Sequence, residues 1–373
     1  MARSLRILVL SVSAGAGHVR AAQALCAAAP DAWEITHIDV MELVPSGFRK
    51  LYAESYIKLV ERAPLLWAYL YQRTDHRRSA SVFDRLRGLI ERLNTRRLDD
   101  EIARIAPDVV ICTHFLPAEL LSRRIAQGRP TPPVWVHVTD FDIHGLWLQP
   151  HMQGYFVAND EVAARLAERG VAAEAIHVTG IAIMPQFASA PARAAAAAEL
   201  GLDPDRMTLL VMSGGAGVGD SETLVERLAA LPGELQIVAL AGRNESLLER
   251  LREIAVRFPG RVVPMGFTRT IECVMATADI AITKPGGLTT SECLAMQLPM
   301  IVVSPIPGQE ERNADFLLES GGALKAVDGA ALTFKVRQLI AAPERLAQMR
   351  ESLRARARPQ AARDILKIVE ERM

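Results

Sequence analysis

AITKPGGLTTSECLAMQLPMIVVSPIPGQEERNADF, residues 281–316, is the stretch that decides the fold of this chain. An apolar run at 280–282 leads into a Lys-Pro-Gly-Gly turn, and a second apolar run follows at 301–303. Between them, the hydroxyl side chains at 289–291 offer N-caps to a helix that Pro299 ends. The pattern predicts a strand, a glycine turn, a helix and a further buried strand, which is typical of an α/β protein.

The same stretch carries polar groups that suit an anionic ligand. Two glycines let the backbone approach a ligand closely, and the free N–H groups at a helix start favour an anion such as a diphosphate. Glu292 lies on the first turn, where a carboxylate can accept hydrogen bonds from ribose hydroxyls. Gln309, Glu310 and Asn313 form a polar cluster in what we expect to be a loop. The alternative is an ordinary turn and a solvated loop, because short glycine motifs also occur without a ligand.

Residues 5–18 show a second strand followed by a glycine turn. The apolar run 5–12 ends at Ser-Ala-Gly-Ala-Gly-His, and an alanine-rich helix is expected over 19–29. His18 is the candidate general base, because a helix N-terminus lowers the pKa of an imidazole and keeps it neutral. The alternative is a histidine that caps its own turn. A dinucleotide fingerprint is matched only loosely, although Asp39 at the end of a second strand keeps that interpretation open.

A third glycine loop follows the apolar run 207–212. Gly214, Gly215, Gly217 and Gly219 bring backbone toward phosphates, and the missing Lys-Ser/Thr excludes a Walker loop. Together with the apolar runs between these loops, they predict two domains. The first covers 1–185 and the second 186–350, and a C-terminal helix follows at 351–373.

Polar residues also follow two further strands in the first half of the chain. His114 follows the run 108–112, and Asp140 and His144 follow the run 133–139. Since ligands bind beyond the carboxyl ends of parallel strands, these side chains are candidates for lining the crevice. A metal site formed with His137 is the rival interpretation, but no spacing fixes a ligand geometry.

The segment between Ser46 and Arg97 differs in composition from the rest. It holds twelve Lys and Arg against five acids, and four of the five tyrosines. Aromatic rings among basic residues suit an anionic membrane surface, where each basic residue contributes about 1 kcal/mol. Tyr52 and Trp67 are among the aromatic residues of this segment that suit such a surface. The alternative is a helical pair packed on its own domain with its arginines in solvent.

The overall composition excludes several classes of protein. The 373 residues carry a formal net charge of zero, so we expect no nucleic-acid partner. The four scattered cysteines indicate reduced, buried thiols in a cytosolic protein. No apolar run reaches the length of a membrane span, and the first strand leaves no room for a signal peptide.

Four motifs resemble the monogalactosyldiacylglycerol synthase and processive diacylglycerol glucosyltransferase family of GT-B glycosyltransferases. They are K-x-G-x-x-T-x-x-E with P-G-Q-E, G-G-G-H-x-x-A-A, T-D-x-x-x-H-x-x-W and G-G-x-G-x-G. One glycine of the second motif is Ala16 here. The resemblance implies the GT-B fold, in which two Rossmann-like, doubly wound domains face a central cleft. It also implies that the C-terminal helix at 351–373 crosses back to the first domain.

The resemblance also implies roles for residues. His18 is expected to be the catalytic base. The implied donor-site residues are Gly214, Gly215, Gly217, Arg243, Phe267, Lys284, Gly286, Gly287, Thr289, Thr290, Glu292, Gln309 and Glu310. The implied acceptor-site residues are Gly17, Asp140, His144, Trp147, Tyr52 and Trp67.

The implied reaction is inverting transfer of glucose or galactose from a UDP-sugar to a membrane lipid hydroxyl, diacylglycerol first among them, without a strict metal requirement. We expect a cytoplasmic enzyme that is peripheral on the inner face of the membrane. The alternatives are a UDP-sugar epimerase and a non-catalytic UDP-sugar-binding regulator on the same fold. The motifs leave open the donor sugar, the lipid, further elongation of the product and the oligomeric state.

Overall fold

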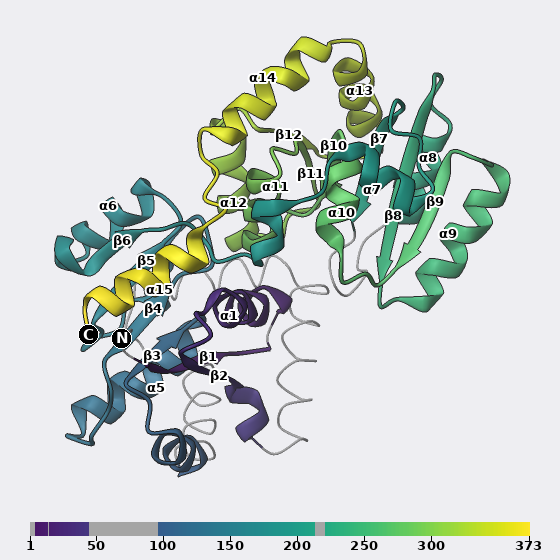
Figure 1. Ribbon diagram of the computed structural model, residues 1–373. Helices are drawn as coiled ribbons and strands as arrows, with labels where there is room; N and C mark the ends of the chain where they lie inside the picture. Colours follow the sequence, from purple (N-terminus) through teal and green to yellow (C-terminus); the bar gives the residue numbers. More distant parts are fainter. Residues whose placement is uncertain (1–3, 14, 45–95, 213–220) are drawn as a thin grey trace. The chain divides into compact units, whose positions relative to one another are not determined.

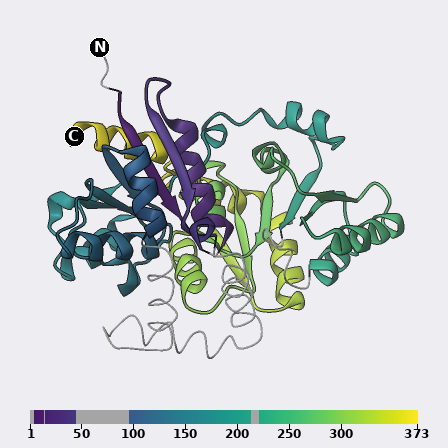
Figure 2. The same ribbon diagram turned by 90° about the horizontal axis from the view of Figure 1, so that it is seen from below.

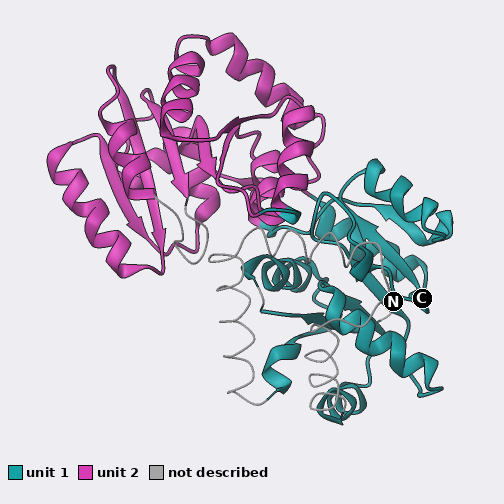
Figure 3. Ribbon diagram, turned by 180° about the vertical axis from the view of Figure 1, so that it is seen from behind, with its two compact units in different colours: residues 1–185, 307–309, 360–373 teal, residues 186–306, 310–359 magenta. Residues whose placement is uncertain are grey.

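The computed structural model describes residues 4–13, 15–44, 96–212 and 221–373. They divide into two compact units (Figure 3). Unit 1 holds residues 1–185, 307–309 and 360–373, and unit 2 holds 186–306 and 310–359. Each unit is built on one six-stranded parallel sheet. The predicted α/β fold with two Rossmann-like domains is therefore confirmed.

Unit 1 contains the strands β1 (Arg6–Ser11), β2 (Glu34–Asp39), β3 (Val109–Cys112), β4 (Val134–His137), β5 (Gly154–Val157) and β6 (Ile176–Val178). Their order in the sheet is β2-β1-β3-β4-β5-β6. The inner strands are continuous apolar runs because helices cover both faces of the sheet. The chain leaves β1 in one direction to form β2 and then returns to β3 on the other side. The carboxyl ends of β1 and β3 therefore form a topological switch point, the usual place for a ligand.

Two sets of helices cover this sheet. On one face α1 (Ala16–Ala28) and α15 (Ala361–Glu371) lie side by side, and Figures 1 and 2 show the pair. The helical residues 96–105, α5 (Phe115–Ala126) and α6 (Asp160–Glu168) contribute to the apolar core on the other face. Short 3₁₀ turns complete the connections, and they are η1 (Val40–Leu43), η2 (Gly145–Trp147), η3 (Ala173–Ala175) and η4 (Pro185–Ser189).

Unit 2 repeats this design. Its strands are β7 (Met207–Met212), β8 (Leu235–Gly242), β9 (Val262–Gly266), β10 (Ile280–Thr283), β11 (Met300–Val303) and β12 (Ala323–Ala326), in the order β12-β11-β10-β7-β8-β9. The switch point lies between β7 and β10. In the sequence, two of the glycine stretches directly follow these two strands, whose carboxyl ends are neighbours in the sheet.

The helices of unit 2 are α7 (Arg193–Leu200), α8 (Ser221–Ala229), α9 (Glu245–Arg257), α10 (Ile271–Thr277), α11 (Gly287–Ala295), α12 (Gln309–Glu319), α13 (Gly329–Ile340) and α14 (Pro343–Arg354). Helices α8, α9 and α13 pack on one face of the sheet, visible beside its strands in Figure 1. Leucine and valine at helical spacing on α9 and α13 form the core there, with charged residues on their outer faces.

Three local predictions need correction. Helix α11 begins at Gly287 with Gly286 as its N-cap, so the hydroxyl residues 289–291 lie inside the helix and do not cap it. The polar cluster at 309–313 is the start of α12 and not a loop. The C-terminal segment was expected to begin at 351, but residues up to Arg354 belong to α14 in unit 2, and only 360–373 join unit 1.

Several predictions fall on residues outside the described ranges. They concern the basic, aromatic segment with Tyr52 and Trp67, and the loop with Gly214, Gly215 and Gly217. Within the described ranges, no helix is both long enough and apolar enough to span a membrane. All four cysteines are free. Cys112 and Cys293 are buried as predicted, whereas Cys26 and Cys273 are partly exposed.

Candidate active site

His18 lies in the first turn of α1, at the switch point of the unit 1 sheet. The structure starts this helix at Ala16, three residues before the predicted start. Two contacts tie His18 to Thr113, which directly follows β3. The ring Nδ1 lies 2.9 Å from the carbonyl oxygen of Thr113, and the Thr113 hydroxyl donates to the carbonyl oxygen of His18 over 2.9 Å. Thr113 therefore holds His18 both by its ring and by its backbone carbonyl group.

These contacts assign the tautomer of the His18 ring. A carbonyl oxygen only accepts hydrogen bonds, so Nδ1 must carry the proton that it donates to Thr113. The neutral ring therefore has its lone pair on Nε2. Among the described residues, no hydrogen bond occupies this Nε2 atom. A neutral imidazole with an available lone pair is the form that a general base requires.

Two neighbouring histidines have the opposite tautomer. The Nδ1 atom of His114 accepts from the Leu116 N–H over 3.0 Å, and that of His144 accepts from the Leu146 N–H over 3.2 Å. In the neutral state both rings therefore carry their proton on Nε2. The His114 ring meets the His18 ring edge-on, with the centroids 4.5 Å apart. The site thus places one base beside a neutral hydrogen-bond donor.

Burial lowers the pKa of His18 from 6.5 to about 4, and the hydrogen bond to the Thr113 carbonyl partly opposes that shift. The sequence predicts that the helix N-terminus lowers the pKa of His18. The pKa is lowered as predicted, but burial is the main cause of the shift. Burial also holds the pKa of His114 well below its usual value, and the nearby His18 adds to this. Both rings are therefore neutral at physiological pH.

Two of the expected acceptor-site residues, Gly17 and Trp147, lie beside this histidine pair. Gly17 lies in the first turn of α1, and the Trp147 ring lies 6.2 Å from the rings of His18 and His114. Trp147 is buried in the core, so it forms a wall of the site. Asp140 is also buried and accepts both hydrogen bonds of the Gln309 amide, at 2.7 and 2.8 Å, within the segments grouped as unit 1.

The rival metal interpretation finds no support in this arrangement. The Nε2 atom of His137 accepts from the Ala182 N–H over 3.0 Å, which uses the lone pair that a metal would need. The Nδ1 lone pair of His114 is likewise used at the start of α5. In the part of the chain that the structure describes, no group of three or more His, Cys, Asp or Glu side chains is placed to hold a metal ion.

The start of α11 in unit 2 offers its backbone N–H groups to a ligand. Its N-cap, Gly286, has no side chain to satisfy them. The Thr290 hydroxyl is buried and has no hydrogen-bond partner among the described residues. Lys284 precedes this turn, and its charge acts on Glu310, whose own pKa is raised by burial. One Glu310 oxygen accepts from the Ile306 N–H over 2.7 Å, which fixes the carboxyl group. The donor N–H groups and the lysine suit a diphosphate.

A flat, cationic surface lies on two neighbouring strands of unit 2. Arg243 follows β8 and Phe267 follows β9, and the guanidinium carbon lies 4.8 Å from the centroid of the phenyl ring. Phe267 is 55% exposed, which is unusual for so large an apolar side chain. Glu292 lies half-buried on α11. These positions agree with a site for a planar base next to a ribose.

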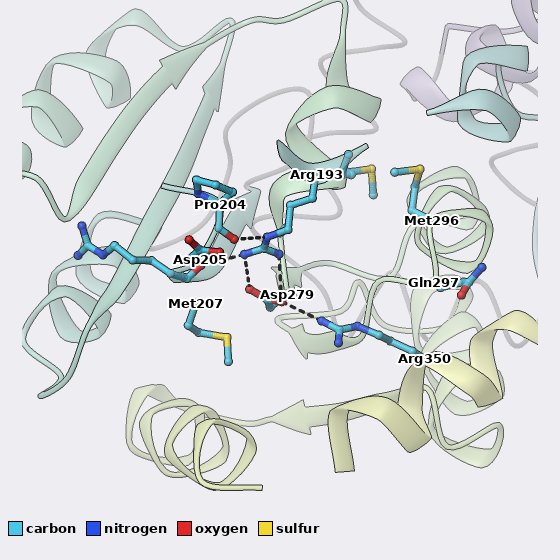
Figure 4. Close-up of a pocket in the computed structure, with 12 residues that line it drawn as sticks. Arg193, Pro204, Asp205, Met207, Asp279, Met296, Gln297 and Arg350 are labelled. Carbon is cyan, nitrogen blue, oxygen red and sulfur yellow. Dashed lines mark hydrogen bonds and ion pairs between the residues drawn. The ribbon is translucent and has the colours of Figure 1, made fainter. Parts of the chain in front are cut away.

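A cavity of about 670 Å³ in unit 2 is not part of this site. Its lining includes Met207 at the start of β7 and Asp279 just before β10, so it lies at the amino ends of the strands. Figure 4 shows Asp279 at its centre, between Arg193 and Arg350. The carboxylate accepts from Arg193 at 2.9 and 3.1 Å and from Arg350 at 2.8 Å. This partly buried ion network joins α7 and α14 to the sheet.

Comparison with known proteins identifies the family. Residues 18–183 match the family model of monogalactosyldiacylglycerol (MGDG) synthase, and residues 208–371 match the glycosyltransferase family 28 C-terminal domain. A processive diacylglycerol beta-glucosyltransferase from Bacillus pumilus is 28% identical over 94% of this chain and 90% of its own length. One from Bacillus mycoides is 33% identical over 70% of this chain and 66% of its own length.

The chain belongs to this family of GT-B glycosyltransferases. Solved structures support the fold of the glycosyltransferase. MurG of Acinetobacter baumannii superposes with a TM-score of 0.66 at 14% identity, covering 98% of this chain and 99% of that one. A Staphylococcus aureus MnaA–UDP structure superposes with a TM-score of 0.63 at 13% identity, covering 98% of this chain and 95% of that one.

Sequence reasoning missed the two threonines that hold the His18 ring. The ring Nδ1 of His18 contacts Thr113, 95 residues away, and the hydroxyl of Thr139, 121 residues away at 2.8 Å. Both threonines closely follow strands of the sheet, and Thr139 belongs to the T-D motif. The signal was therefore their place after β3 and β4, next to the switch point.

Proposed function

We propose that this glycosyltransferase moves a hexose, glucose or galactose, from a UDP-sugar to the hydroxyl of diacylglycerol, with inversion at the sugar C1. The contact of His18 Nδ1 with the Thr113 carbonyl carries the proposal, because it leaves Nε2 as a base next to the switch point. The relatives named processive diacylglycerol beta-glucosyltransferases support the lipid acceptor and the glucosyl group.

In the proposed step, Nε2 of His18 takes the proton of the lipid hydroxyl as that oxygen attacks C1 of the sugar. The new C1–oxygen bond forms while the bond from C1 to the diphosphate oxygen breaks, and the electron pair leaves with UDP. A single displacement inverts C1, so an α-linked donor yields a β-glycoside. The proton is later released to water, which returns His18 to its neutral form.

Unit 2 stabilises the leaving group in this proposal. The first-turn N–H groups of α11 and the Lys284 ammonium meet the diphosphate, with the side chains of Thr289 and Thr290 beside them. Glu292 accepts from the ribose, Phe267 and Arg243 flank the uracil, and the loop at 213–219 approaches the phosphates. Gln309 and Glu310 bind sugar hydroxyls. Because this positive potential is part of the protein, we propose that no metal ion is strictly required.

The proposed place of action is the inner face of the cell membrane, to which the enzyme binds peripherally. The twelve Lys and Arg between Ser46 and Arg97 support this, since they outnumber the five acids there and attract anionic lipid. Tyr52 and Trp67 supply the aromatic rings that favour headgroup depth. Nucleic acid is not a proposed partner.

Donor turnover tests this proposal. The purified protein is given UDP-glucose, UDP-galactose or UDP-N-acetylglucosamine with diacylglycerol in anionic vesicles, and UDP release and glycolipid are measured. We expect β-linked glycolipid from one hexose donor. Tight UDP binding without release from any donor would favour a regulator, and conversion of the donor without transfer would favour an epimerase.

Replacing Lys284 by alanine is expected to weaken UDP binding about 10-fold to 100-fold, because it removes a charge-assisted contact with the diphosphate. Isothermal titration of UDP measures this change. Lys325 on β12 supplies a matched control, since it lies on another strand and is exposed, and Lys325→Ala should leave UDP affinity unchanged. Equal UDP affinity in the Lys284 variant and the wild type would show that the ammonium does not meet the diphosphate.

The pH dependence of kcat/KM tests the state of the base. Because burial lowers the pKa of His18 to about 4, its neutral fraction stays nearly complete from pH 8 down to about pH 5. Activity should then fall as pH drops further, when Nε2 becomes protonated. An acid limb near pH 6.5, the ordinary histidine value, would contradict this assignment. Initial rates with saturating vesicles over pH 4.5 to 8 give the profile.

A further inference from the structure

We infer that Thr139 is a positioning residue of the transfer reaction, whose hydroxyl oxygen shares the Nδ1 proton of His18 with the Thr113 carbonyl. Two neutral oxygens then support the base in the place where a carboxylate supports the histidine of many hydrolases. This inference rests on the proposed role of His18 as the base, and it adds the Thr139 hydroxyl, which acts on the reaction through the His18 ring.

The geometry at Nδ1 carries the argument. The Thr139 Oγ1 lies 2.8 Å from Nδ1, and the Thr113 carbonyl oxygen lies 2.9 Å from the same atom. Since the carbonyl fixes the proton on Nδ1, the threonine oxygen must accept a share of that proton. Both threonines are buried, at 3% and 0% exposure, so neither contact competes with bulk water.

Backbone geometry keeps the Thr139 oxygen in place. The residue stands just past the end of β4, which pairs with β3, and the next residue of the chain after β3 is Thr113. The two acceptors thus come from neighbouring strands of one sheet. The Thr113 hydroxyl also donates to the His18 carbonyl oxygen, so the first turn of α1 cannot shift without breaking this set.

The contact is stronger in the transition state than in the resting enzyme. When Nε2 takes the acceptor proton, the ring becomes a cation and its Nδ1–H becomes a stronger donor, so both oxygens bind it more tightly. Two titratable groups interact with the ring, His114 at the start of α5 and His137 on β4, and the buried Asp140 and His144 follow β4 in the chain. Within the part of the chain that the structure describes, no carboxylate oxygen is hydrogen-bonded to this ring.

Three substitutions of Thr139 test the inference. Thr139→Val keeps the shape but removes the oxygen, and we expect kcat to fall about tenfold with the donor KM unchanged. Thr139→Ser keeps the oxygen and should restore most of kcat. Thr139→Asp places a carboxylate on Nδ1 and should raise the acid limb of kcat/KM by about one pH unit or more.

Nitrogen-15 NMR of the His18 ring reports on the contact without any turnover. In the wild type we expect the tautomer with the proton on Nδ1, and in Thr139→Asp a raised pKa of the ring. Finding the proton on Nε2 in the wild type would overturn the inference. So would a valine variant that matches the wild type in both kcat and pH profile.

A purely structural role predicts a different pattern. Valine and serine variants would then lose activity together with melting temperature, and the pH profile of the aspartate variant would not move; either result overturns the inference. If the wild type transfers no sugar from any donor, the proposed function fails, and the NMR titration still decides whether Thr139 holds the ring.

Discussion

Replacing His18 by alanine is expected to lower kcat about 1,000-fold, while UDP affinity stays within about twofold of the wild type. General bases contribute 10² to 10⁴ in rate. Among the described residues, His114 and His144 cannot replace His18, because both use their ring lone pair on backbone N–H groups. The donor contacts proposed for unit 2 remain intact, so binding and turnover should separate. Glycolipid formation and UDP titration measure the two effects.

His151→Ala is the matched control for this experiment. His151 is an exposed histidine of the same unit, so its loss should change neither kcat nor UDP affinity. A His18→Ala variant that keeps a tenth or more of wild-type kcat would exclude His18 as the base. Loss of UDP binding in that variant would instead indicate that the substitution disturbs more than the proton transfer.

Replacing Gly154 by alanine is expected to destabilise unit 1 by about 3 kcal/mol. Gly154 on β5 is the cross-strand partner of Trp135 on β4, and the missing side chain leaves room for the indole ring. An added Cβ would lie 2.5 Å from a Trp135 ring carbon and 2.7 Å from the Ala175 carbonyl oxygen. The ring is buried and stacks on Phe156 with the centroids 4.9 Å apart, so it has no space to move.

Thermal unfolding followed by circular dichroism measures this loss, which should lower Tm by about 10 °C. Gly266→Ala is the control, because Gly266 also lies on a parallel strand but an added Cβ would meet its nearest atom at an ordinary 3.4 Å. Its Tm should change by less than about 2 °C. Equal Tm values for the two variants would mean that the tryptophan ring does not fill the space above Gly154.

Much of the sheet architecture could be predicted from the sequence. Buried parallel strands are continuous apolar runs, so β7 begins and ends at the predicted residues. The glycine turns after β1 and β10 also marked where helices begin. The predicted start of α11 was wrong. The helix begins at Gly287, with the extended Gly286 as its N-cap, before the hydroxyl residues 289–291. The start of α12 was missed because its first turn is polar and lacks apolar spacing.

The site was predicted as a set of positions but not as a set of contacts. The place of His18 on a helix start could be read from the glycine turn beside it. Its partners could not, because Thr113 and Thr139 reach it only through the order of strands in the sheet, which brings β3 next to β1. The tautomer of the ring depends on those partners. Local sequence pattern therefore placed His18 at a helix start, and the fold determines which ring nitrogen carries its proton.

The pairing of α1 with α15 has a consequence for how the enzyme is made. More than 300 residues separate the two helices, which at ordinary rates of translation is roughly 15 s to one minute of synthesis. Until α15 emerges from the ribosome, the apolar face of the helix that carries His18 lacks the cover of Ile365, Leu366 and Val369. Until then, the nascent chain exposes an apolar, aggregation-prone surface on α1. The folding of α15 covers that surface.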